Sequence, residues 1–213
     1  YMARRGRSFG DDPAAVAALA AAMVDGHCTA GVAATLKHFP NQGATLEDPH
    51  DGLSRSNDAL TEWRTRGRIP YAATAAPGVM TGHILMADVD ENRPASVSRE
   101  ITTGLLRGDL GYGGVVVTDD LDALAGVTGA VGDRGERATE AVAAGADLVL
   151  FVGFGPHDDI IDAIVARAEA DATFAARVDE SVARVLRLKA AFGLVDELDP
   201  AWFELCQPGN SAE

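Results

Sequence analysis

Four short apolar runs along the chain each end in polar residues. They lie at 29–39, 78–85, 113–121 and 145–153. The third is the clearest, because three consecutive valines at 115–117 come directly before Thr118, Asp119 and Asp120. Continuous apolar runs of this length are typical of strands that are buried on both faces of a parallel sheet. The pattern therefore predicts four such strands, each followed by a polar loop.

Segments with helical periodicity precede, separate or follow these runs. They lie at 13–27, 98–111, 133–145, 158–170 and 177–195. The first follows Asp11 and Asp12, either of which can cap the helix, and has Pro13 at its first position. We expect two apolar stripes to face the core. They comprise Val16, Leu19, Met23 and Val24 in the first helix and Val178, Val182, Val185 and Leu186 in the last.

The alternation of strands and helices predicts right-handed βαβ units and hence an α/β fold with a parallel sheet. An open doubly wound sheet and a part of an eight-stranded barrel both fit this order. No Gly-x-Gly-x-x-Gly sequence follows any of the runs, which argues against a dinucleotide-binding fold. Both architectures place active sites at the carboxyl ends of the strands, where the polar residues gather. The pattern therefore favours an enzyme.

Composition is that of an ordinary globular protein, and the charge excludes some partners. The 213 residues are 47% hydrophobic and 23% charged, which is enough for one sizeable core. The formal net charge of −14 repels a phosphate backbone, so we expect no nucleic-acid partner. The longest apolar run, at 146–154, has the length of a strand and not of a membrane span, so we expect no membrane partner.

Two cysteines lie far apart in the sequence. Neither Cys28 nor Cys206 has a metal-ligand or redox spacing. Two unpaired thiols are typical of a reducing compartment. We therefore expect a cytoplasmic location, with secretion as the alternative.

A crowded loop follows the first predicted strand. The segment 35–52, TLKHFPNQGATLEDPHDG, carries Lys37, His38, Asp48 and His50 among turn-forming residues. Histidine and carboxylate side chains can bind a metal, but this spacing matches no metal signature, and we expect neither a metal nor a cofactor. Alternatively, Asp48 can orient the ring of His50 and raise its basicity, so that the pair transfers protons. A third reading is that His50 is an exposed loop residue without chemistry.

Adjacent carboxylates end the third strand. Successive side chains of a strand point to opposite faces, so only one of Asp119 and Asp120 can point into a site. That residue could act as a nucleophile or as a metal ligand. Alternatively, one or both carboxylates cap the helix that follows.

Five motifs occur in one order along the chain. They are GRSFGDDP, KHFPNQG with DPH behind it, VMTGHI, ENRPASVS and GGVVVTDDL. Together they resemble the β-N-acetylglucosaminidases of glycoside hydrolase family 3, from about Arg5 to about Val195. The resemblance implies a (β/α)₈ barrel of the TIM type and a retaining, exo-acting enzyme. Its expected substrate is a carbohydrate, β-linked N-acetylglucosamine of cell-wall-derived or similar glycosides.

The resemblance also assigns roles to individual residues. Asp119 aligns with the nucleophile, His50 with the general acid/base and Asp48 with the carboxylate that partners it. Positions that bind the sugar in the family align with Arg7, Lys37 and His38. Proton transfer by a general acid/base contributes roughly 10²–10⁴-fold to a rate.

The chain departs from the family pattern near the candidate site. Asn41 and Gln42 stand where the family has Gly and His, Pro49 replaces a small Ser, and Leu124 replaces Met. Neither Asn41 nor Gln42 titrates, and Pro49 restricts the backbone of Asp48.

The resemblance further implies an incomplete barrel. A full barrel needs roughly 250 residues, so the resemblance implies that residues 1–213 are a single catalytic domain of the family, incomplete at its start. An open half-barrel exposes strand edges, so we expect self-association or a partner that completes the barrel. Two alternative functions stay open: a family 3 glycosidase or phosphorylase of other specificity, and a truncated homologue that binds sugar without catalysis.

Overall fold

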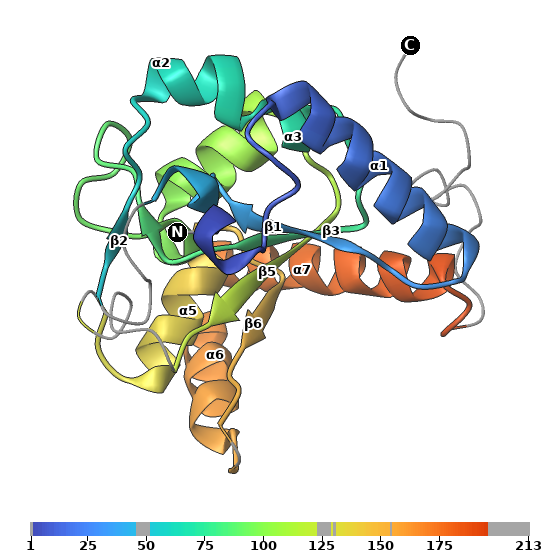
Figure 1. The fold of residues 1–213 in the computed structure, drawn as a ribbon. Coiled ribbons are helices and arrows are strands. Elements are labelled where there is room, and N and C mark those ends of the chain that lie inside the picture. The colour runs from blue at the N-terminus through green and yellow to red at the C-terminus, as the bar shows by residue number, and fades with distance from the viewer. Residues whose placement is uncertain (1, 46–51, 123–128, 130, 154, 196–213) are drawn as a thin grey trace.

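A computed structural model describes residues 2–45, 52–122, 129, 131–153 and 155–195. Its main sheet has four parallel strands, seen near the centre of Figure 1. In spatial order they are β1 (Thr35–Phe39), β3 (Gly78–Thr81), β5 (Val115–Asp120) and β6 (Leu148–Leu150). Each strand lies inside one of the four apolar runs, so the prediction of four parallel strands is confirmed. The predicted burial holds for β3 and β5, whereas β1 and β6 are partly exposed. A second, two-stranded parallel sheet pairs β2 (Ser54–Arg55) with β4 (Ile84–Leu85).

The order of the strands distinguishes the two predicted architectures. The spatial order of the main sheet is the same as the chain order, and every neighbouring pair is parallel. Right-handed crossovers that always step in one direction leave the helices on one face of the sheet, as in the wall of a barrel. A doubly wound sheet would instead reverse its order at a switch point. The fold is therefore an α/β fold of the TIM-barrel type, as predicted.

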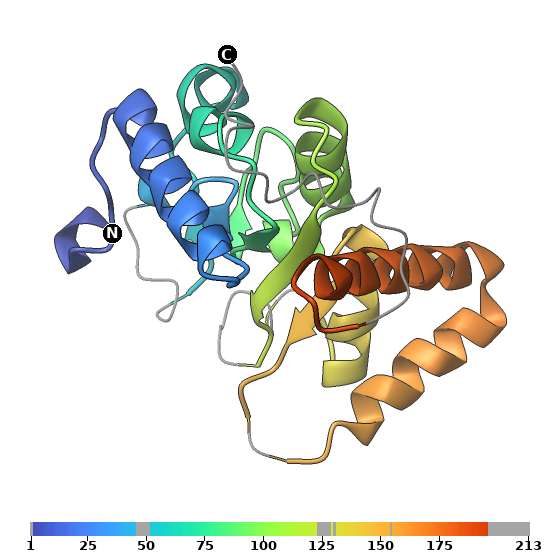
Figure 2. The same ribbon diagram turned by 90° about the vertical axis from the view of Figure 1, so that its right-hand side faces the viewer.

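Helices connect the strands. The α-helices are α1 (Pro13–Thr29), α2 (Leu60–Glu62), α3 (Ile69–Ala72), α5 (Arg134–Ala144), α6 (Asp158–Ala170) and α7 (Ala172–Ala191). Two π-type helices are η3 (Trp63–Gly67) and η5 (Glu100–Asp109), and three short 3₁₀ turns are η1 (Ala3–Arg5), η2 (Gln42–Ala44) and η4 (Ala95–Val97). Figure 2 shows α1 and α6 on opposite sides of the molecule.

The predicted cap of the first helix is confirmed at Asp12. Its side chain accepts a hydrogen bond from the backbone N–H of Ala14, and Pro13 occupies the first helical position. The stripe predicted for this helix is only partly correct. Val24 is buried, but Leu19 and Met23 are 49% and 53% exposed. The helix packs instead through small side chains, because alanines allow the close approach of α1 to α3.

The apolar stripe predicted for the last helix is also wrong in part, since Val182 and Leu186 are 51% and 38% exposed. The middle of the buried face of α7 is polar, between the buried side chains of Phe174 and Ala190. Arg177, Ser181 and Arg184, one helical turn apart, all bond to the buried carboxylate of Asp147. This carboxylate therefore decides which face of α7 turns inward.

An aromatic cluster holds the loop that follows β1. Phe39 is fully buried and makes edge-to-face contacts with Trp63 at 5.9 Å and with Tyr71 at 5.1 Å between ring centroids. The indole N–H of Trp63 donates to the carbonyl of Pro40 at 3.0 Å. The cluster belongs to the main hydrophobic core, which also includes Val79 and Val116 of the central strands. The packed rings of Phe39, Trp63 and Tyr71 therefore hold the backbone that follows β1 in place.

The structure also describes the helices that could be compared with a membrane span and one of the two cysteines. Within the described part of the chain, none of the helices combines the length and the apolarity needed to cross a membrane. Cys28 lies in α1 and is partly exposed, whereas Cys206 lies outside the described residues.

Candidate active site

The two carboxylates at the end of β5 have different surroundings. The side chain of Asp120 is nearly buried, and its Oδ1 accepts hydrogen bonds from the backbone N–H groups of Asp122 at 3.0 Å and Val152 at 3.1 Å. The side chain of Asp119 is 27% exposed, and its Oδ2 lies 3.5 Å from Nε2 of His38. Asp120 therefore holds the loops after β5 and β6 together, and Asp119 is the carboxylate that remains available for chemistry.

His38 comes to this carboxylate from the end of β1, two strands away in the sheet. The pairing of β1 with β3 shifts between Lys37 and Phe39, so His38 is left out of the ladder. The Lys37–His38 and Phe39–Pro40 peptide bonds are both cis. The ring is 5% exposed, and its Nδ1 is buried without a hydrogen-bond partner.

The pKa of His38 is lowered to about 4. Burial is the main cause; the Asp119 carboxylate opposes it, and the positive charges of Lys37 and Arg7 add to it. The ring is thus neutral at pH 7. A neutral ring that directs Nε2–H toward Asp119 keeps a lone pair on Nδ1, which can accept a hydrogen bond from a ligand.

The cationic residues predicted for sugar binding lie at the same place. Both Arg7 and Lys37 are exposed, and the charges of both reach the ring of His38. Of the three predicted sugar-binding residues, His38 lies beside Asp119, and Arg7 and Lys37 are near enough for their charges to act on the ring of His38. The other two candidates, Asp48 and His50, lie outside the described residues, as do Pro49 and Leu124.

The two departures from the family pattern that the structure describes differ in their contacts. Asn41 donates from its amide to the carboxylate of Asp58 at 2.9 Å, which ties the loop after β1 to the segment before α2. Gln42 is 5% exposed, and its Oε1 is buried without a partner. Asn41 thus has a structural contact, whereas Gln42 presents an unused acceptor.

Sequence reasoning missed a buried residue behind this site. His83 is 3% exposed and contacts both Ser96, at 2.6 Å, and the backbone carbonyl of Asp120, at 2.9 Å. The signal was present, because His83 and Ser96 fall inside the motifs VMTGHI and ENRPASVS. Neither motif alone shows that these two side chains meet.

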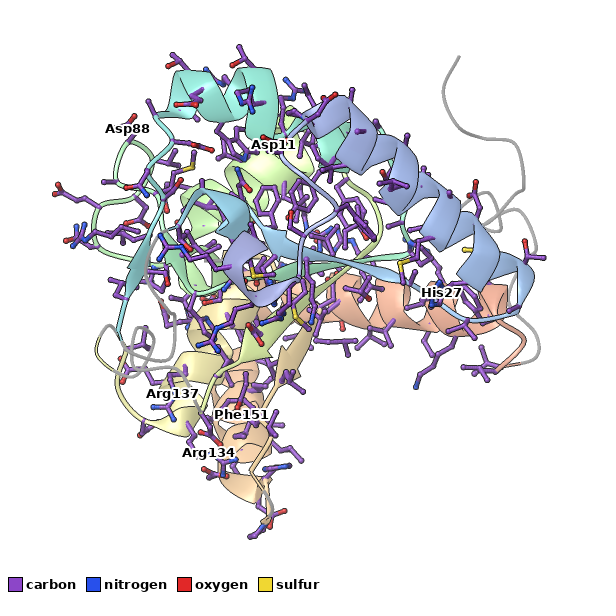
Figure 3. The ribbon with its side chains drawn as sticks, viewed as in Figure 1. Asp11, His27, Asp88, Arg134, Arg137 and Phe151 are labelled. Carbon is purple, nitrogen blue, oxygen red and sulfur yellow. The ribbon has the colours of Figure 1, made fainter. Side chains whose placement is uncertain are left out.

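An ion-pair cluster that was not predicted lies beside β6 and α5. Arg134 bonds to Asp122 at 3.2 Å and to Nδ1 of His157 at 3.1 Å, and its guanidinium lies 5.1 Å from the ring centroid of Phe151. Figure 3 shows Arg134 and Phe151 close together, with Arg137, which also bonds to Asp122, beside them. Asp122 is thereby held three residues beyond Asp119. Across the described ranges, no group of three or more His, Cys, Asp or Glu side chains is arranged to hold a metal ion.

Known proteins resemble this chain in sequence. A family profile described as "Glycosyl hydrolase family 3 N terminal domain" matches residues 2–188. A beta-hexosaminidase of Stenotrophomonas maltophilia (strain K279a) is 37% identical over 159 residues, which are 73% of this chain and 45% of that protein. The chain thus spans about half the length of the curated relative that it matches.

Solved structures superpose on most of this chain. A family 3 beta-N-acetylglucosaminidase from Paenibacillus sp. str. FPU-7 superposes with a TM-score of 0.81 and 34% identity, covering 94% of this chain and 41% of that one. A beta-glucoside phosphorylase, BglX, superposes with a TM-score of 0.79 and 29% identity, covering 93% of this chain and 38% of that one.

Proposed function

Since the chain belongs to glycoside hydrolase family 3, with a profile match over residues 2–188, we propose that it acts as a retaining, exo-acting β-N-acetylglucosaminidase. The observation that carries the proposal is the meeting of Asp119 and His38, 3.5 Å apart, at the ends of β5 and β1. A partly exposed carboxylate beside a neutral ring and two cationic side chains suits the binding and attack of a neutral sugar.

In the proposed reaction Asp119 is the nucleophile. Its carboxylate oxygen forms a bond to the anomeric carbon while the glycosidic C–O bond breaks, and His50 gives its proton to the leaving oxygen. Water then attacks the glycosyl-enzyme, returns its proton to His50 and frees Asp119. Two displacements at the same carbon retain the anomeric configuration.

The other candidates hold the sugar. Arg7 and Lys37 donate N–H hydrogen bonds to hydroxyl and acetamido oxygens, and the unpaired Nδ1 of His38 accepts from a hydroxyl once a sugar is bound. Asp48 orients the ring of His50. We further propose cell-wall-derived glycosides as the substrates and a cytoplasmic location.

A chromogenic N-acetylglucosaminide and the matching glucoside test the proposal. We expect release of chromophore from the first at a higher kcat/KM than from the second. A 5-fluoro sugar that traps the intermediate should label Asp119 in a peptide map, and Asp119→Asn should neither turn over substrate nor take up label. Label on a different carboxylate of an active preparation would contradict the assignment.

A second candidate is a glycoside phosphorylase, favoured by the likeness to BglX at a TM-score of 0.79. A histidine acid/base carries no negative charge, so it repels an incoming phosphate less than a carboxylate would. Turnover that requires phosphate and yields a sugar 1-phosphate would show that the chain is a phosphorylase and not a hydrolase. Saturable binding of N-acetylglucosamine without turnover would instead indicate a non-catalytic homologue.

A further inference from the structure

A buried histidine lies directly behind the proposed nucleophile. We infer that His83 is a positioning residue, which fixes the end of β5 so that the Asp119 carboxylate faces the sugar. This inference rests on the proposed function. His83 lies between β3 and β4, is 3% exposed and does not touch the proposed sugar-binding groups through any described hydrogen bond.

Its ring links two elements that are distant in the sequence. One ring nitrogen, Nε2, lies 2.9 Å from the carbonyl oxygen of Asp120, at the end of β5. The other, Nδ1, lies 2.6 Å from the hydroxyl of Ser96, in η4. Because a carbonyl can only accept, Nε2 carries the proton, and Nδ1 accepts from the Ser96 hydroxyl.

The protonation state of this ring supports that assignment. Burial lowers the pKa of His83, although the backbone contact and the nearby carboxylates of Asp119 and Asp120 oppose the shift. The ring is therefore neutral at neutral pH, and one tautomer is fixed by its two partners. A ring with a fixed tautomer and two bonds cannot rotate without losing both.

The bond to Asp120 reaches the nucleophile through the backbone. The N–H of Asp120 donates to Oδ1 of Asp119 at 2.9 Å. The carboxylate of Asp120 accepts hydrogen bonds from two further N–H groups, those of Asp122 and Val152. His83 thus holds the carbonyl of Asp120 on one side, and the N–H groups of Asp122 and Val152 hold its Oδ1, so the residue whose own N–H bonds to Asp119 is restrained through both its backbone and its side chain. A misplacement of about 1 Å at a reacting group can cost roughly 10²-fold in rate.

Two substitutions separate positioning from packing. In His83→Gln the side-chain amide N–H reaches the position of Nε2 and can still donate to Asp120. In His83→Asn the amide reaches only the position of Nδ1, so the bond to Ser96 can form but the bond to Asp120 is lost. We expect His83→Gln to keep at least ten times the kcat of His83→Asn, with KM values within about threefold of each other.

Melting temperatures of both variants are measured alongside, so that activities are compared at a temperature where each is folded. A His83→Asn protein with the kcat of the wild type would overturn the inference, and so would equal losses of kcat in both variants. Should His83→Asn not fold, ¹⁵N NMR of the wild-type ring decides, because the inference requires a proton on Nε2 and none on Nδ1.

The two failures can be told apart. A wild-type chain that turns over no glycoside, with or without phosphate, contradicts the proposed function alone. The NMR tautomer of His83 remains measurable in that protein, and a proton on Nδ1 would overturn the positioning role independently of any activity.

Discussion

At the scale of single residues, adjacent side chains divide between structure and chemistry. Asp119 and Asp120 are identical in type, yet one is 27% exposed beside His38 and the other is bound to two backbone N–H groups. The pleat of the strand separates them, since successive side chains point to opposite faces. A pair of carboxylates at a strand end can therefore supply one reactive group and the support that holds it.

This division predicts that two alanine substitutions differ in their effects on stability and on turnover. We expect Asp120→Ala to lower the free energy of unfolding by roughly 1–3 kcal/mol, because it leaves two partly buried N–H groups without an acceptor. Asp119→Ala should lower it by less than half of that amount while abolishing turnover. Urea unfolding followed by circular dichroism measures both. Equal losses of stability in the two variants would contradict the division.

The lowered pKa of His38 makes stability depend on pH. The ring of the unfolded chain takes up its proton near pH 6.5, and the folded ring only near pH 4. The unfolded state therefore binds more protons between these values, so the stability falls as the pH falls from 6.5 to 4. The full effect of His38 is about 3 kcal/mol.

Urea unfolding of the wild type and of His38→Gln at pH 4.5, 5.5 and 6.5 tests this expectation. The variant should show a shallower decrease of stability than the wild type over the same range. His83, whose pKa is lowered too, is present in both proteins, so the difference between them belongs to His38. Parallel curves would show that His38 is not neutral when folded near pH 5.

At the scale of elements, one buried carboxylate fixes the last helix. The side chain of Asp147, at the start of β6, is fully buried and bonds to Arg107, Arg177 and Arg184 at 2.7–3.2 Å. It also accepts from the N–H of Val116 at 2.9 Å, which ties it to β5. Three guanidinium groups thus share this one buried negative charge.

Removing that charge should be costly. We expect Asp147→Asn to lower the free energy of unfolding by roughly 3–5 kcal/mol, because three partly buried cations lose the buried carboxylate that they share. Glu180→Gln is the matched control: Glu180 pairs with Arg177 and Arg184 but its side chain is 60% exposed, so the loss should stay below about 1 kcal/mol. Guanidinium chloride is unsuitable for the measurement because it screens charges, so urea is used. A loss for Asp147→Asn no larger than that of the control would contradict this account.

The same cluster explains which parts of the fold the sequence could predict. Local signals were sufficient for the strands, because three consecutive valines mark β5, and for the cap of α1 at Asp12. They were insufficient for the buried face of α7. An apolar stripe containing Val182 looks like a core face, but the contacts of Asp147 decide the rotation of the helix.

Some contacts of the candidate site could be predicted from the sequence, and others could not. The motifs place Asp119 and His38 at strand ends, and parallel strands bring such ends together, so their meeting could be predicted. The contact of His83 with Ser96 and Asp120 could not be predicted, because no spacing in the sequence shows which buried polar groups will pair. The assignment of Asp48 and His50 stays a prediction.

At the scale of the whole molecule, the main sheet has two edge strands in the part of the chain that the structure describes. In the described part of the chain, β1 and β6 each pair with one neighbour only. Apolar side chains lie exposed on the elements beside these edges: Leu148 is 42% exposed on β6, Ile161 58% on α6 and Met23 53% on α1. Unpaired parallel edges flanked by apolar surface favour association.

Four parallel strands are half of an eight-stranded barrel, so a second copy of the chain has the number of strands that would close it. With a twofold axis along the barrel, β6 of one copy would pair with β1 of the other at both seams. We therefore expect the 213-residue chain to form a dimer whose mass by light scattering is twice 22.1 kDa. Because each copy carries a net charge of −14, the dimer should tighten as salt is added.

Leu148→Lys places a charge on the open edge of β6 and should shift the equilibrium toward the monomer. Leu194→Lys is the control, since Leu194 is 72% exposed and lies outside the sheet. Equal dimerisation in both variants would show that the edge of β6 is not the contact. A wild-type chain that stays monomeric at about 100 times the protein concentration of the assay, in high salt, would contradict closure by a second copy.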